Sequence, residues 1–94
     1  MDESLRMIEK EITVGVHCGI HGRVAAELAK LARASGVQLE LQSPQGIADC
    51  SSILDILALG ISRGSRTRVC AAGPDADTVL ARACLLLSGT GEEE

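Results

Sequence analysis

Aromatic side chains are missing altogether from this chain, whose 94 residues include no Phe, Tyr or Trp. Proteins that bind single-stranded nucleic acid stack the bases on aromatic rings and surround them with positive charge. Here the formal net charge is -4 at pH 7, so the sequence argues against a nucleic-acid partner. A hydrophobic content of 46%, all of it aliphatic or sulfur-containing, is enough to close one lightly built core.

The sequence also lacks the long apolar run of a membrane span, and its opening residues MDES lack the basic start of a secretion signal. There is no Cys-x-x-Cys pair, because the four cysteines are spread over the chain as Cys18, Cys50, Cys70 and Cys84. This spacing favours reduced thiols over a disulfide framework or a zinc cluster. We therefore expect a cytoplasmic protein without membrane insertion, in which Cys70 and Cys84 are small buried hydrophobes.

Alternation of apolar and polar residues predicts four strands. They cover residues 8–16, residues 37–42, a short stretch around Ile47 and residues 66–71. The turn at residues 43–46 contains Pro44 and Gly46 and joins the second and third strands as a hairpin.

Three helices are predicted between and after these strands. Residues 24–35 have helical periodicity, with a start at about Gly22 or Arg23 and a stop at Gly36. Ser52 is expected to cap a second helix that runs to about Leu59. Residues 73–75 (Gly-Pro-Asp) open a third, with proline and acids in its first turn. Its buried stripe consists of Ala76, Val79, Leu80, Ala83 and Leu87.

The resulting order is strand, helix, strand, strand, helix, strand, helix. Such an order predicts an α+β fold, with helices segregated on one face of a mostly antiparallel sheet. We expect a single domain over residues 1–88 and a disordered acidic tail over residues 89–94.

His21 and Arg23 stand where the first helical pattern begins. The amino end of a helix favours an anion, because its first N–H groups lack partners. An arginine adds a planar set of donors that suits phosphate oxygens, and a neutral imidazole is a nucleophile near pH 7. The pair therefore suits a histidine that carries a phosphoryl group. Spacing alone leaves open an idle loop histidine beside a solvated arginine.

A metal or redox site is another reading of the same segment. His17, Cys18 and His21 are suitable ligand types, but no fourth ligand stands nearby at a recognised spacing. Cys18, in a turn next to a helix start, is alternatively a redox-sensitive thiol.

The second predicted helix carries two further features. Ser52 precedes Asp55 by three residues, the spacing of a capping serine, and a phosphate on its hydroxyl would add negative charge at a helix start. Leu54 and Ala58 lie off the expected buried stripe, so they are candidates for a partner surface. The expected stripe consists of Ile53, Ile56, Leu57 and Gly60.

Three ordered motifs resemble the HPr family of histidine-containing phosphocarrier proteins. Residues 19–26 (GIHGRVAA) resemble the family's active-site signature, residues 52–60 its serine motif, and residues 72–76 the turn into its last helix. The similarity spans residues 7–88. It implies an open-faced sandwich, in which three helices cover one face of a four-stranded antiparallel sheet.

The resemblance also implies a function. His21 would accept a phosphoryl group on Nδ1 from enzyme I, which draws it from phosphoenolpyruvate. It would pass the group to the sugar-specific A components of the phosphotransferase system, while Arg23 neutralises phosphate charge. Such a protein is a monomeric carrier rather than a turnover catalyst and needs no cofactor or metal. Ser52 matches the position that HPr kinase/phosphorylase modifies in some bacteria.

This chain departs from the family pattern at the site. Val24 stands where the family usually has proline, and Gly22 where it usually has Ala, Ser or Thr. Valine has a backbone N–H that proline lacks, and glycine adds backbone freedom. We expect Gly22 and Val24 to belong to the partner surface together with Leu54 and Ala58. These departures and the Leu54 patch leave a second function open, a regulatory binding module without sugar transport.

Overall fold

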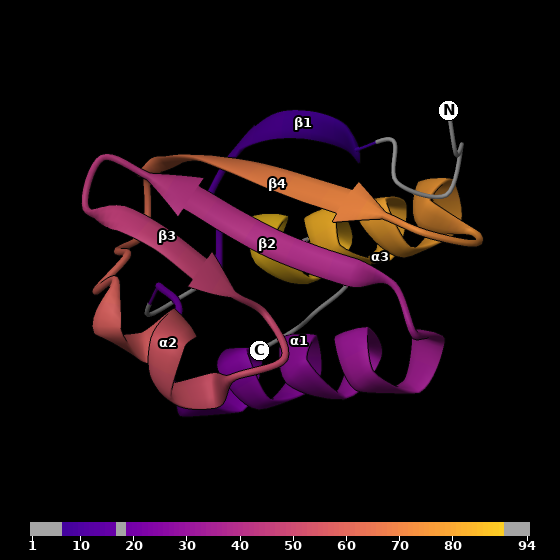
Figure 1. Ribbon diagram of the computed structural model, residues 1–94. Helices are drawn as coiled ribbons and strands as arrows, with labels where there is room; N and C mark the ends of the chain where they lie inside the picture. The colour runs from indigo at the N-terminus through magenta and orange to yellow at the C-terminus, as the bar shows by residue number, and fades with distance from the viewer. Residues whose placement is uncertain (1–6, 17–18, 90–94) are drawn as a thin grey trace.

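The computed structural model describes residues 7–16 and 19–89, and Figure 1 shows its helices gathered on one side of a sheet. The elements are β1 (Met7–Thr13), α1 (Gly22–Ser35), β2 (Gln38–Ser43), β3 (Gly46–Asp49), α2 (Ile53–Ala58), β4 (Arg66–Ala72) and α3 (Ala76–Ser88). The sheet has four strands in the order β1-β4-β2-β3, and every neighbouring pair is antiparallel. The predicted α+β open-faced sandwich and its element order are confirmed.

The core lies between the inner face of the sheet and the helices. Leu39 and Leu41 of β2 alternate with polar residues, as the sequence predicted, and both are fully buried. Leu28 of α1 and Leu87 of α3 are fully buried as well. Alternation in the strands and a 3.6-residue period in the helices therefore direct the large aliphatic side chains into one space.

The cysteines of the described residues form no disulfide and are buried. Cys70 and Cys84 are buried, as predicted, and so is Cys50. The pKa of the Cys50 thiol is raised to about 12, mainly by burial and further by the nearby carboxylate of Asp49. These side chains therefore pack as small uncharged groups at neutral pH.

The first strand is shorter than predicted. It ends at Thr13 instead of residue 16, because the chain then leaves β4 and runs to the end of α3. The amides of Gly15 and Val16 both donate to the carbonyl of Leu87, over 2.9 and 3.3 Å. Val14 and Val16 remain buried, so the apolar pattern that predicted a strand continues into an irregular segment of the core.

The predicted opening of the last helix is also wrong in part. Pro74 and Asp75 precede α3 instead of forming its first turn, and Asp77 is the acid that lies in that turn. Asp75 adopts a left-handed conformation with φ 62°, which a helix cannot include. The helix therefore begins at Ala76, directly after Asp75.

At the carboxyl end of α3, Gly89 is the cap residue in a left-handed conformation, with φ 81°. Residues 90–94 of the expected tail lie outside the described residues. Among the residues that are described, no helix is long and apolar enough to cross a bilayer.

Candidate functional site

His21 is the residue that caps the amino end of α1. Its backbone is extended, with φ -118° and ψ -172°, and its Nδ1 atom accepts a hydrogen bond of 3.2 Å from the amide of Arg23. Its carbonyl accepts from the amide of Ala25 at 2.9 Å, which closes the first helical turn. Because a ring nitrogen that accepts a hydrogen bond carries its lone pair, a neutral imidazole held this way has its proton on Nε2.

The side chains of the site are open to solvent. His21, Gly22 and Arg23 are exposed. Among the described residues, the guanidinium of Arg23 has neither an ion pair nor a hydrogen bond. The site therefore combines an exposed nucleophilic nitrogen, a cation without a fixed partner and the amino end of a 14-residue helix.

The segment before His21 is held by backbone contacts. The amide of Ile20 donates to the carbonyl of Ile61 at 3.0 Å, and the Ile20 side chain is buried. Gly19 has φ 75°, and a Cβ atom there would lie 2.8 Å from the Ile61 oxygen. Glycine is required at this position because the two chain segments approach so closely. His21 is thus exposed but follows directly on an anchored residue.

His17 and Cys18 lie outside the described residues. The alternative metal or redox site of His17, Cys18 and His21 therefore stays a prediction.

Ser52 caps α2, as predicted. Its hydroxyl accepts from the amide of Asp55 at 3.2 Å, and the side chain is half-buried. The preceding residue makes its own local contacts, because the amide and the hydroxyl of Ser51 both donate to Asp49 Oδ1, over 2.9 and 2.8 Å. These bonds hold the pKa of the Asp49 carboxyl below its usual value.

Arg33 is a residue near Ser52 that sequence reasoning missed. Its Nε and Nη2 atoms donate to the carbonyl of Ser51, over 3.0 and 2.8 Å, and thereby join the end of α1 to the start of α2. Arg33 is exposed to solvent near the carboxyl end of α1. The contact itself spans 18 residues and has no local signal.

The four residues of the expected partner surface lie on two helices that contact each other, α1 and α2. Leu54 is 78% exposed, and Ala58 and Gly22 are exposed, whereas Val24 is half-buried against the core.

The predicted buried stripe of α2 is wrong at Leu57 and Gly60, which are exposed. Leu59 is buried instead, together with Ile56. The amide of Leu59 donates to the carbonyl of Ile56, three residues back, so the helix ends in a tighter turn than a 3.6-residue period assumes.

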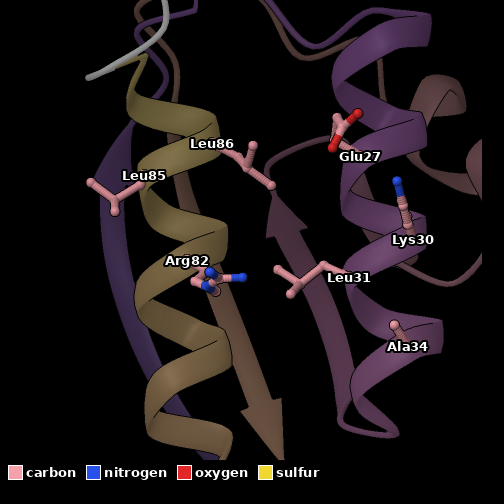
Figure 2. Close-up of a pocket in the computed structure, with 7 residues that line it drawn as sticks. All are labelled: Glu27, Lys30, Leu31, Ala34, Arg82, Leu85 and Leu86. Atoms are coloured by element: carbon pink, nitrogen blue, oxygen red, sulfur yellow. The ribbon is translucent and has the colours of Figure 1, made fainter.

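A separate groove of about 470 Å³ runs between α1 and α3 (Figure 2). Its apolar side chains are Leu31, Leu85 and Leu86, and its charged ones are Glu27, Lys30 and Arg82, with Ala34 completing the lining. It contains none of the predicted site residues. His21 and Arg23 instead lie on an exposed part of the surface outside this groove.

Comparison with known proteins gives the family. Residues 8–88 match the family described as PTS HPr component phosphorylation site. The chain is 28% identical over 86 residues to the phosphocarrier protein NPr of Shewanella violacea. The matched region covers 92% of this chain and 94% of that protein. The chain is 30% identical over 70 residues to the phosphocarrier protein HPr of Vibrio cholerae, which covers 74% and 82%.

Solved structures agree with this result. HPr-C-His from Thermoanaerobacter tengcongensis superposes with a TM-score of 0.81 at 26% identity, over 93% of this chain and 99% of that one. The phosphocarrier protein HPr from Bacillus anthracis has the same fold, with a TM-score of 0.81 at 23% identity, over 86% and 96%. Sequence and fold therefore lead to one conclusion, that this chain belongs to the HPr family of phosphocarrier proteins of the phosphotransferase system.

Proposed function

We propose that this chain carries a phosphoryl group on Nδ1 of His21, between enzyme I and the sugar-specific A components of the phosphotransferase system. The observation that supports this most is the hydrogen bond from the Arg23 amide to Nδ1, which orients the lone pair of an exposed ring. The lone pair attacks the phosphorus carried by the donor, the donor's bond to phosphorus breaks, and the ring keeps its Nε2 proton. No proton has to leave the histidine before attack.

Exposure of the site suits a carrier. Charge develops on the oxygens of a phosphoryl group in transfer, and positioning with electrostatic stabilisation provides most of the rate. The cation of Arg23 and the amino end of α1 are placed to provide this stabilisation. Because the His21 side chain is exposed, two partners can reach the same ring in turn.

The test uses both histidines of the chain. The protein is incubated with phosphoenolpyruvate, Mg²⁺ and enzyme I of a relative, and phosphate uptake is followed by intact mass. We expect one acid-labile phosphate, lost in His21→Ala and kept in His17→Ala, the matched control. Equal labelling of wild type and His21→Ala would refute the proposal. Labelling without onward transfer to any A component would instead favour the regulatory binding module.

Leu54, Ala58, Gly22 and Val24 are proposed as the docking surface for these partners. Leu54 supports this, because a leucine that is 78% exposed contributes nothing to the core. We expect Leu54→Asp to slow phosphoryl transfer from enzyme I while the free energy of unfolding changes by less than about 0.5 kcal/mol. Leu85→Asp is the control, since Leu85 is 56% exposed in the groove between α1 and α3. Equal slowing by both variants would argue against this surface.

Phosphorylation of Ser52 by an HPr kinase/phosphorylase is proposed as a second, regulatory modification. Arg33 supports it, because its guanidinium is bound to the carbonyl of the neighbouring Ser51. Asp55 opposes it, since its amide is the one that the Ser52 hydroxyl caps and its carboxylate would repel a phosphate. Incubation with such a kinase and ATP should label wild type but not Ser52→Ala. If the wild type is not labelled, the proposal is wrong, and capping α2 is the role that remains for Ser52.

A further inference from the structure

The amide of Val24 is a hydrogen-bond donor without an acceptor, next to the atom that is proposed to carry phosphate. In the first turn of α1, Ala25 donates to the His21 carbonyl and Arg23 donates to His21 Nδ1. No acceptor for the Val24 amide lies among the described residues. The side chain of Val24 is half-buried against the core, so the position of this amide is fixed by packing.

A side chain at the capping position can reach two amides, those of the second and third helical residues. In α1 these are Arg23 and Val24, because the helix begins at Gly22. The imidazole presents one lone pair at Nδ1, so it can satisfy one of the two, and in the structure it satisfies Arg23. The Val24 amide is therefore left to solvent as long as His21 is unmodified.

Phosphorylation changes this balance. Once Nδ1 is bonded to phosphorus, its lone pair is used and the bond from the Arg23 amide is lost. Three charged oxygens then stand next to two parallel backbone donors. A charged acceptor strengthens a backbone hydrogen bond at a helix start, and it also interacts favourably with the helix dipole.

We propose that the Val24 amide, together with that of Arg23, donates to the phosphoryl group on His21. Before phosphorylation, the His21 side chain offers this helix end one acceptor, Nδ1. After it, the phosphoryl group offers at least two oxygens as acceptors. This inference rests on the proposed function of His21. The phosphate itself is supported independently of the helix end, since residues 8–88 match a family defined by a phosphorylation site.

The consequence is a change in how tightly the carrier holds its phosphoryl group. An added donor stabilises the phosphorylated state, so the equilibrium with enzyme I shifts toward the loaded carrier. One such exposed hydrogen bond corresponds to a roughly 2- to 10-fold change in that equilibrium constant.

The direct test is NMR of ¹⁵N-labelled protein before and after phosphorylation. Phosphoramidate, a small chemical donor, replaces enzyme I: Nδ1 attacks its phosphorus, the nitrogen–phosphorus bond of the donor breaks, and ammonia leaves. We expect the amide proton signals of both Arg23 and Val24 to move downfield. A Val24 signal that stays in place in protein phosphorylated on His21 overturns the inference. A protein that gains no phosphate on His21 from either donor overturns the proposed function instead.

Two variants measure the effect on equilibrium. Val24→Pro removes the amide proton, and a proline in the first turn breaks no bond within the helix. Val24→Ala also shortens the side chain but keeps the donor, so it is the matched control. The two variants are mixed and equilibrated with a catalytic amount of enzyme I. We expect the ratio of phosphorylated to free protein to be roughly 2- to 10-fold higher for Val24→Ala than for Val24→Pro. Equal ratios contradict the inference, and if Val24→Pro does not fold, the NMR result on the wild type decides.

Discussion

Thr67 is the one buried polar side chain of the core among the described residues. It lies on the inner face of β4 with 1% exposure, and its Oγ1 atom has no hydrogen-bond partner. Burying a hydroxyl without a partner costs free energy that an isosteric apolar group does not. We expect Thr67→Val to raise the free energy of unfolding by about 1 kcal/mol, measured by urea denaturation.

The control for this variant is Thr78→Val on the exposed face of α3. The same change there should alter stability by less than about 0.5 kcal/mol. A loss of stability in Thr67→Val would show that the hydroxyl has a partner, such as a buried water.

Asp49 makes the stability of the folded protein depend on pH, in a direction that follows from its hydrogen bonds. Its carboxylate accepts the amide and the hydroxyl of Ser51, and these bonds lower its pKa in the folded state. A lowered folded pKa adds stability above the unfolded value of about 3.9, and this stability is lost as the pH falls through the folded value.

The matching measurement is urea denaturation of wild type and Asp49→Asn at pH 7 and below pH 3. The wild type should be the more stable at pH 7, by less than about 1 kcal/mol because the carboxylate is exposed. The difference should shrink in acid. An advantage that grew in acid would contradict the assigned hydrogen bonds.

At the scale of elements, the cap of α2 can be separated from any regulatory role of its serine. Ser52 Oγ accepts the Asp55 amide, and α2 has only six residues, so the cap is a large part of its stabilisation. Ser52→Ala should lower the free energy of unfolding by about 1 kcal/mol. Ser52→Asn should restore most of it, because asparagine is a good cap but cannot be phosphorylated on a hydroxyl. Equal losses in both variants would show that the cap does not stabilise this helix.

Element boundaries were predictable where the signal is local. Gly36 ends α1 in a left-handed conformation and Ser52 caps α2, and both follow from the residue type and its neighbours. The end of β1 was not predictable, because it depends on the carbonyl of Leu87, more than 70 positions away in the sequence. The start of α3 depends on the left-handed conformation of Asp75, a non-glycine residue for which the sequence gives no clear signal.

The same distinction applies to the candidate site. His21 and Arg23 are two residues apart, so their joint position at a helix start could be predicted from the sequence. That Nδ1 rather than Nε2 accepts the Arg23 amide depends on the side-chain rotamer, which the pattern does not give. The Arg33 contact with the Ser51 carbonyl needs the packing of α1 against α2, and it was therefore missed.

At the scale of the whole molecule, the two ends of the fold meet beside the segment that leads to His21. Gly15 and Val16 donate to the Leu87 carbonyl, and a Cβ atom on Gly15 would collide with the carbonyl oxygen of Ser88. A Cβ atom on Gly89 would come within 2.8 Å of the Gly15 oxygen. The end of α3 thus fits directly against the segment that, four residues after Gly15, reaches the anchored Gly19.

This close fit predicts opposite results for two glycine-to-alanine changes near the site. Gly15→Ala must push the backbone of Ser88 away, and such overpacking should cost about 1–3 kcal/mol of unfolding free energy. Gly22→Ala meets no atom within 4 Å and lies at the start of α1 without a left-handed φ, so it should be neutral or stabilise by up to about 1 kcal/mol. Urea denaturation compares the two. The amide NMR signals of residues 19–21 should also shift in Gly15→Ala, because the displaced end of α3 moves the segment before His21. If Gly15→Ala were as stable as Gly22→Ala and left those signals in place, the end of α3 would not position the phosphorylation site.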